Sequence, residues 1–170
     1  MVSGEVNMFL KIRPSYHLRV LSHEFSGIAI MFVVLYFLKF NSDALMIFGI
    51  WFAVLTIPVV YLHFEYYLVN RGQEIIIENE QLSIVSRNGD SKKFKFTELD
   101  KVILYKSASM DKGGIPLMPS ESYYFARIFT KSEEQITITC LMYPKLDEVV
   151  DKLIGVRKIR KRGFCTLWWK

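Results

Sequence analysis

Cysteine is scarce in this sequence, and the few cysteines follow no metal-binding or disulfide pattern. Cys140 and Cys165 are the only two among 170 residues, and neither belongs to a C-x-x-C pair. Zinc sites and disulfide frameworks need closer, repeated spacings of cysteine or histidine. We therefore expect two free thiols in a reducing compartment, without a metal ion or a cofactor.

Recognisable catalytic motifs are absent as well. The sequence contains no nucleophile elbow, no Walker loop and no H-E-x-x-H pair, and no histidine lies near either cysteine. Asp147, Glu148 and Asp151 have the spacing of a solvated helix face, which we favour over a pair of catalytic carboxylates. We expect a protein that is not an enzyme.

Charge is missing from two long apolar runs. Residues 25–38 read FSGIAIMFVVLYFL and residues 44–62 read ALMIFGIWFAVLTIPVVYL. The second run has the roughly 20 residues that cross a bilayer. The first run reaches that length when it is extended back through Leu18. Neither run shows the polar stripe of a soluble core helix. Because the polar link at residues 39–43 is short, we predict an antiparallel transmembrane hairpin over residues 25–65, with a kink near Pro58.

Cations flank this hairpin unequally. Lys11, Arg13 and Arg19 precede it, whereas the link offers only Lys39, which Asp43 offsets. By the positive-inside rule, residues 1–24 form a cytoplasmic segment and both chain termini face the cytoplasm.

Ionisable residues gather at the predicted cytoplasmic ends of both helices. They are His23 and Glu24 on the first helix and His63 and Glu65 on the second. Such side chains could meet as a hydrogen-bonded interfacial cluster or as a metal site. We favour the cluster, because no further metal ligand is recognisable.

Strand-like patterns fill residues 70–153. Short β-rich runs at residues 74–77, 81–85, 92–96, 101–106, 123–130 and 135–141 are separated by turn residues, including the Asn88-Gly89 pair of a tight hairpin. Residues 144–153 (PKLDEVVDKL) place apolar side chains at spacings of three and four, which predicts an amphipathic helix. We expect residues 70–153 to fold alone as a cytoplasmic β-rich domain that this helix closes.

The segments FKFTELDKVILYKS and EEQITITCLMYPKLDEVVDKL, with the order of the short strands, resemble bacterial pleckstrin-homology-like (PH-like) domains. The resemblance covers residues 74–153. Such domains follow one or two transmembrane helices in many small membrane proteins. The resemblance implies an α+β membrane protein: a two-helix transmembrane hairpin, then a PH-like β-sandwich or barrel with a C-terminal capping helix. It also implies a lipid-, peptide- or protein-binding module in the bacterial inner membrane, and it brings no ligand-binding residues of its own.

The long segment at residues 107–122 offers a candidate ligand site. Mobile backbone N–H groups and cations there suit an anionic ligand such as a phosphoinositide-like headgroup or a cyclic nucleotide. The residues are Lys106, Lys112, Gly113, Gly114 and Arg127. An ordinary flexible loop has the same composition, and residues 120–124 would equally serve as a protein-contact edge.

Residues 154–170 form a basic aromatic tail. Six cations and no acid stand there against a net charge of +5, so the rest of the chain sums to 5 − 6 = −1. Because the surplus is local, we expect no nucleic-acid binding. Instead we expect the tail to lie on the inner leaflet, with a disordered tail or a partner contact as alternatives. The expected membrane-surface residues are Arg157, Lys158, Arg160, Lys161, Arg162, Trp168 and Trp169.

These patterns together predict a non-enzymatic, membrane-anchored binding or scaffold module whose domain docks a protein or an anionic ligand. Its expected partners are the lipid bilayer, a protein or further copies of the same chain. One alternative is a cyclic-nucleotide-sensing membrane effector of antiphage defence, a class that shares the two helices and β-rich domain but opens with a glycine-tryptophan strand not found here. Another is an accessory subunit of a larger membrane complex.

Overall fold

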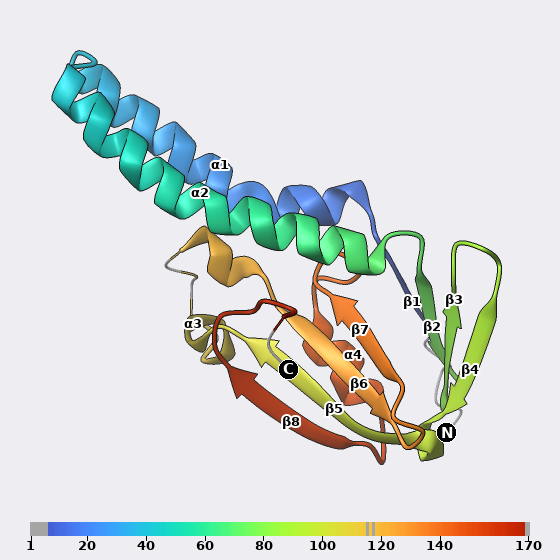
Figure 1. Cartoon of the computed structure of the whole chain (residues 1–170). Coiled ribbons are helices and arrows are strands. Elements are labelled where there is room, and N and C mark those ends of the chain that lie inside the picture. The colour runs from blue at the N-terminus through green and yellow to red at the C-terminus, as the bar shows by residue number, and fades with distance from the viewer. Residues whose placement is uncertain (1–6, 115, 117, 169–170) are drawn as a thin grey trace.

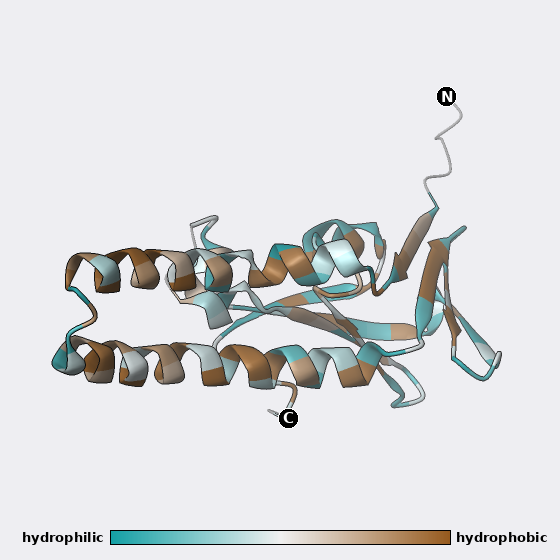
Figure 2. Ribbon diagram, turned by 90° about the horizontal axis from the view of Figure 1, so that it is seen from above, coloured by the Kyte–Doolittle hydropathy of each residue, from teal (hydrophilic) through white to brown (hydrophobic). Residues whose placement is uncertain are grey.

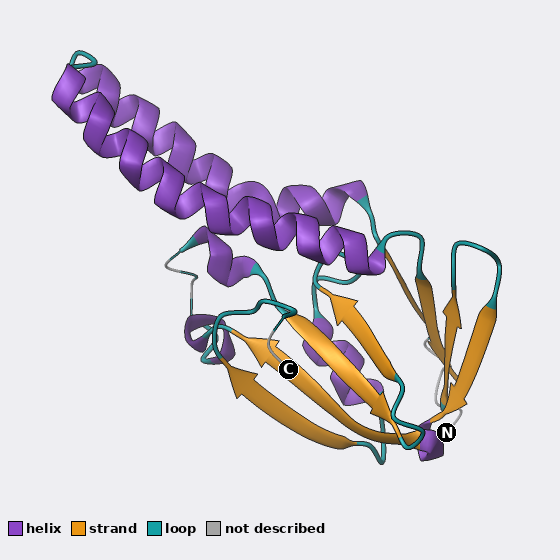
Figure 3. Ribbon diagram, viewed as in Figure 1, coloured by secondary structure: helices purple, strands orange, loops and turns teal. Residues whose placement is uncertain are grey.

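The computed structural model describes residues 7–114, 116 and 118–168, and it combines a helical hairpin with two four-stranded sheets (Figure 1, Figure 3). The hairpin consists of α1 (Pro14–Phe37) and α2 (Ser42–Asn70). The first sheet contains β1 (Met8–Lys11), β2 (Glu74–Glu78), β3 (Gln81–Val85) and β4 (Ser91–Lys95). The second contains β5 (Leu99–Lys106), β6 (Phe125–Thr130), β7 (Gln135–Thr139) and β8 (Arg157–Arg162). The connections hold η1 (Phe96–Glu98), α3 (Ala108–Asp111), η2 (Pro119–Ser122) and α4 (Leu146–Lys152).

Both hairpin helices are long and apolar enough to cross a membrane. α1 has 24 residues and α2 has 29, which correspond to about 36 and 44 Å. Pro14 occupies the first turn of α1, where its missing N–H costs no hydrogen bond. The side chain of Asn41 caps α2 by accepting a hydrogen bond from the Asp43 N–H at 2.7 Å. Pro58 lies inside α2, which continues through it to Asn70.

The hairpin has two halves with different surroundings. We define the inner half as residues 14–24 and 58–70, which lie across the sheets, and the outer half as residues 25–57, most of which extends beyond them (Figure 1). Hydrophobic residues cover much of the outer half (Figure 2). Large apolar side chains are exposed along it, among them Phe32, Val33, Ile47, Ile50 and Trp51.

Each sheet takes one strand from outside residues 70–153. β1 precedes the hairpin, yet it pairs antiparallel with β2, with Met8 opposite Ile77. β8 follows α4 and pairs in parallel with β5, with Lys101 opposite Arg157. The segment that the sequence analysis treated as a complete domain therefore lacks two of the eight strands. The structure differs from that expectation because both strands pair with partners distant in the sequence.

A single hydrophobic core joins the two sheets, α4 and the inner half of the hairpin. α4 buries Leu146, Val149 and Val150, the apolar stripe that its spacing predicted. The hairpin contributes Val20, Val59, Leu62 and Tyr66, and the sheets contribute residues such as Leu10, Ile75, Leu82, Leu104, Phe125, Ile128 and Ile138. The helices are therefore part of the folded domain as well as an apolar extension of it.

Candidate functional site

The basic residues of the predicted tail form β8, an edge strand whose side chains alternate between two faces of the second sheet. On one face, aspartates of α3 and α4 balance the cations. Lys158 lies 3.8 Å from Asp151, Arg160 lies 3.6 Å from Asp147 and 3.8 Å from Asp111, and Arg162 lies 2.6 Å from Asp111. Three of the strand's five cations are thus already paired within the fold.

The opposite face of the second sheet, which we call the open face, carries the remaining cations of β8. Arg157 and Lys161 lie beside Lys101 and Tyr105 of β5 in the parallel register. The Lys161 ammonium lies 5.6 Å from the centre of the Tyr105 ring, in cation–π contact. Within the described residues, neither Arg157 nor Lys161 has an acidic partner within 4.0 Å, whereas Lys101 lies 3.7 Å from Asp100.

Arg127 lies at the centre of the open face. Its guanidinium is buried and lies 5.6 Å from the ring centre of Tyr105 and 5.2 Å from that of Phe125. It also donates a hydrogen bond to the carbonyl oxygen of Leu167. Arg127 is therefore held by the protein itself, in contact with the C-terminal residues.

Residues 163–168, which we call the C-terminal strap, run from β8 back to α2 (Figure 1). The Glu65 carboxylate accepts hydrogen bonds from the Leu167 N–H at 3.0 Å and the Thr166 hydroxyl at 3.2 Å. The Tyr66 hydroxyl donates to the Cys165 carbonyl oxygen at 2.5 Å. Glu65 and Arg127 thus hold the two backbone polar groups of Leu167 from opposite sides.

A groove of 440 Å³ adjoins the strap on the open face. Its lining combines both charge signs with apolar surface: Glu65, Val69, Arg127, Gln135, Leu167 and Trp168. Trp168 is exposed at the rim of the groove, and its place on the membrane surface stays a prediction. Trp169 lies outside the described residues.

The residues predicted to bind an anionic ligand do not converge. Lys106 points to the core side of β5, where its ammonium bonds Asp147 at 2.5 Å, and Arg127 points to the open face. Lys112 is exposed in the turn after α3. The N–H groups of Gly113 and Gly114 donate to the carbonyl oxygens of residues 110 and 109 at 3.2 and 2.9 Å. The glycines therefore close a turn, and their N–H groups are not aimed at a common point.

The ionisable residues near the hairpin ends also separate into different contacts. His63 bonds His17 at 2.9 Å through Nε2 and the Tyr123 hydroxyl at 2.9 Å through Nδ1. Glu24 accepts from the Thr56 hydroxyl at 2.5 Å, while Glu65 holds the strap. In the part of the chain that the structure describes, no group of three His, Cys, Asp or Glu side chains could hold a metal ion.

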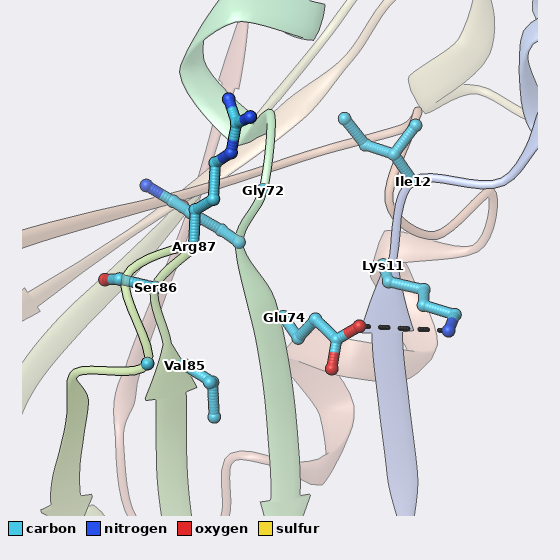
Figure 4. Close-up of a pocket in the computed structure, with 9 residues that line it drawn as sticks. Lys11, Ile12, Gly72, Glu74, Val85, Ser86 and Arg87 are labelled. Carbon is cyan, nitrogen blue, oxygen red and sulfur yellow. Dashed lines mark ion pairs between the residues drawn. The ribbon is translucent and has the colours of Figure 1, made fainter.

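A second hollow lies at the other sheet, where β1 and β3 end and β2 begins near the helices (Figure 4). It measures 550 Å³, and Lys11 and Arg87 supply its cations. Lys11 lies 3.8 Å from Glu74. Gly72, at φ +73°, leaves space for Arg87, because a Cβ added at Gly72 would lie 2.8 Å from the Arg87 Cβ. We rank this hollow below the open face, since one of its two cations, Lys11, is paired with Glu74.

Comparison with known proteins places the chain in a family. No curated protein matches the sequence. A family model described as PH domain matches residues 13–147, which span both hairpin helices and all strands from β2 to β7. β8 and the strap follow the matched residues. Because the match covers well over half of the 170 residues, the chain belongs to this PH domain family.

Proposed function

We propose that this protein is a non-enzymatic, membrane-anchored docking module, and that β8 with the open face binds an extended acidic segment of a partner protein. The observation that carries the proposal is the pair Arg157 and Lys161, which project from an edge strand without acidic partners among the described residues. An edge strand leaves one row of backbone N–H and C=O groups for an added strand. Acidic side chains on that strand would then meet the cations.

The order of the strands supports a protein partner over the bilayer. The sheet order is β7-β6-β5-β8, so β7 lies at one edge and β8 at the other. Asn70 of α2 closes the β7 edge, because its side-chain amide donates to the Thr137 carbonyl at 2.8 Å and accepts from the Thr139 N–H at 3.1 Å. β8 is the edge away from α2 (Figure 1) and is therefore open to a water-soluble segment.

The anchor in this proposal is the hairpin, with the chain ends and the sheets on the cytoplasmic side. Ser42→Cys, in the link region, should react with a membrane-impermeant maleimide added to intact cells. Ser132→Cys, in the exposed β6–β7 turn, should react only after the membrane is opened. The reverse labelling pattern would overturn the proposed orientation. If neither cysteine reacted in intact cells, the proposal that the hairpin crosses the membrane would be wrong.

Docking is tested with the full chain in nanodiscs of neutral lipid, which removes lipid charge from the measurement. The probe is a nine-residue peptide of alternating glutamate and threonine. Reversing two cations, R157E with K161E, should weaken peptide binding at least tenfold, since each opposite-charge contact would become a like-charge contact. The matched control, K93E with K95E, changes the same charge at exposed positions of β4, in the other sheet, and should leave binding within about twofold.

Three results would overturn the docking proposal. One is no peptide binding at millimolar concentration. Another is equal weakening by the control pair, which would show that only net charge matters. The third is a tighter association with anionic lipid nanodiscs than with the peptide, lost in the R157E/K161E variant, which would assign the face to lipid.

A further inference from the structure

A cleft of 270 Å³ lies between α1 and α2 in the outer half of the hairpin. Along α1 it runs from Glu24, at the border with the inner half, to Val34, which is about 15 Å of helix. Among the described residues that line it, Glu24 alone is ionisable and the others are apolar. The apolar lining includes Gly27, Ile28, Met31, Phe52 and Leu55.

Glu24 places a buried carboxylate at the inner end of this cleft. The residue is 7% exposed, and it accepts a hydrogen bond from the Thr56 hydroxyl at 2.5 Å. No lysine, arginine or histidine nitrogen of the described residues lies within 4.0 Å of the carboxylate. Buried charges in apolar surroundings are costly unless an opposite charge pairs with them. Thr56 supplies one neutral hydrogen bond, so the positive complement of Glu24 must come from elsewhere.

The size of the cleft favours one hydrocarbon chain as its occupant. Its volume lies below the range of about 300–1,000 Å³ that is typical of pockets for drug-sized molecules. Gly27 leaves the middle of the cleft open, because a Cβ added there would have no other heavy atom within 4 Å. A narrow apolar cleft with one buried carboxylate at its end therefore suits a linear molecule with a cationic head.

We propose that this cleft binds a single-chain amphiphile with a primary ammonium head. The ammonium pairs with the Glu24 carboxylate, and the hydrocarbon tail lies along Gly27 and Met31 toward the link. An anionic head would meet Glu24 as a like charge. The inference rests on the proposed membrane anchoring, which puts the tail among lipid chains, and it is independent of peptide docking. Free long-chain amines and single-chain ethanolamine phospholipids share this head chemistry.

Photo-labelling of the full chain tests the site in nanodiscs of choline-headed lipid, which carries no ammonium N–H group. The probe is a primary amine on a twelve-carbon chain with a diazirine in that chain. The signal is the covalent labelling that an excess of unlabelled amine displaces, and mass spectrometry should locate it in residues 27–34 and 48–55. The same chain with a sulfate head should give less displaceable labelling by about tenfold or more. Displacement by a single-chain ethanolamine phospholipid as well would identify lipid as a source of the ligand.

Two variants test the carboxylate and the space separately. E24Q removes the charge but keeps an oxygen for the Thr56 hydroxyl, and it should reduce displaceable labelling by about tenfold or more. G27L fills the cleft and should have a similar effect. G49L is its matched control, because Gly49 has equally open surroundings on α2 but does not line the cleft. This control should stay within about twofold, since leucine is a good helix former.

Four results would overturn the site. They are the absence of displaceable labelling, equal displaceable labelling by the ammonium and sulfate probes, unchanged labelling in E24Q, and equal losses in G27L and G49L. Cysteine labelling at Ser42 and Ser132 reads the anchoring separately. If the hairpin crosses the membrane as proposed and the amine labelling still fails, this inference is wrong while the anchoring stands.

Discussion

The two halves of the hairpin are built from similar apolar residues but make different contacts. The outer half exposes its large side chains, and its one described polar contact to the other helix, Thr56 with Glu24, lies at the border with the inner half. The inner half donates or accepts a hydrogen bond at almost every turn. His63, Glu65, Tyr66 and Asn70 contact Tyr123, the strap and β7.

This difference separates two roles of one helix pair. An apolar residue is equally suited to lipid and to a core, so composition identifies the hairpin but does not locate the sheets along it. The polar side chains of the hairpin do show where the sheets lie, because a buried polar group needs a hydrogen-bond partner. The hairpin and the sheets are consequently one structural unit, and we expect a fragment of residues 70–153 to lose both the strands β1 and β8 and its helical cover.

Truncating the largest fully buried side chain of the inner half gives the largest expected effect. Tyr66 is fully buried, packs edge-on against Tyr123 and Phe125, and bonds the strap. Tyr66→Ala should lower the free energy of unfolding of the domain by about 3–5 kcal/mol, the range for large aromatic truncations in a core. Denaturant unfolding in a mild detergent, followed by circular dichroism of the β-rich part, measures this.

The matched control lies in the outer half. Tyr36 is 70% exposed, so Tyr36→Ala should leave the unfolding of the sheets unchanged within about 0.5 kcal/mol. Similar losses for both variants would show that the sheets depend on the whole hairpin, and the distinction between the halves would fail.

A smaller effect is expected where the inner half closes the β7 edge. Asn70→Leu keeps the volume but leaves the Thr137 carbonyl and the Thr139 N–H without their side-chain partner. Leaving buried polar groups unpaired costs about 1–3 kcal/mol. Hydrogen exchange should accelerate at Thr139 more than elsewhere in the sheet. Gln135→Leu, at an exposed position of the same strand, is the control, and an equal effect there would mean that Asn70 has no special role.

Local patterns in the sequence predicted the elements that fold through local contacts. The hairpin, the six strands of residues 74–141 and α4 follow from apolar runs, alternation and three-four spacing. β1 escaped the prediction because four residues give little periodicity and their partner lies beyond the hairpin. β8 escaped it because RKIRKR offers a single apolar residue, Ile159, and its partner β5 is reached only by a parallel crossover.

The candidate site shows the same limit. Composition identified the cations, and Arg127 alternates with Phe125 and Phe129 in a way that places all three on one face. No local pattern sets the register between β5 and β8, so Lys106 on the core side and Lys161 on the open side could not be told apart before the structure. The hold of Glu65 and Tyr66 on the strap depends on residues about 100 positions apart, and no local signal reports it.

The smallest expected effect concerns the contact between the inner half and the strap, and Cys165 reports on it. Burial raises the pKa of the Cys165 thiol to about 12, so maleimide labelling at pH 8 requires the strap to open. Tyr66→Phe removes only the hydrogen bond to the Cys165 carbonyl, worth about 0.5–1.5 kcal/mol, and should therefore raise the labelling rate about 2- to 12-fold. Cys140 is the internal control, since it is fully buried in the core with a pKa raised by burial to about 12. Mass spectrometry of the two labelled peptides gives both rates. If Cys140 accelerated equally, the variant would be loosening the whole core, and the strap would have no opening of its own.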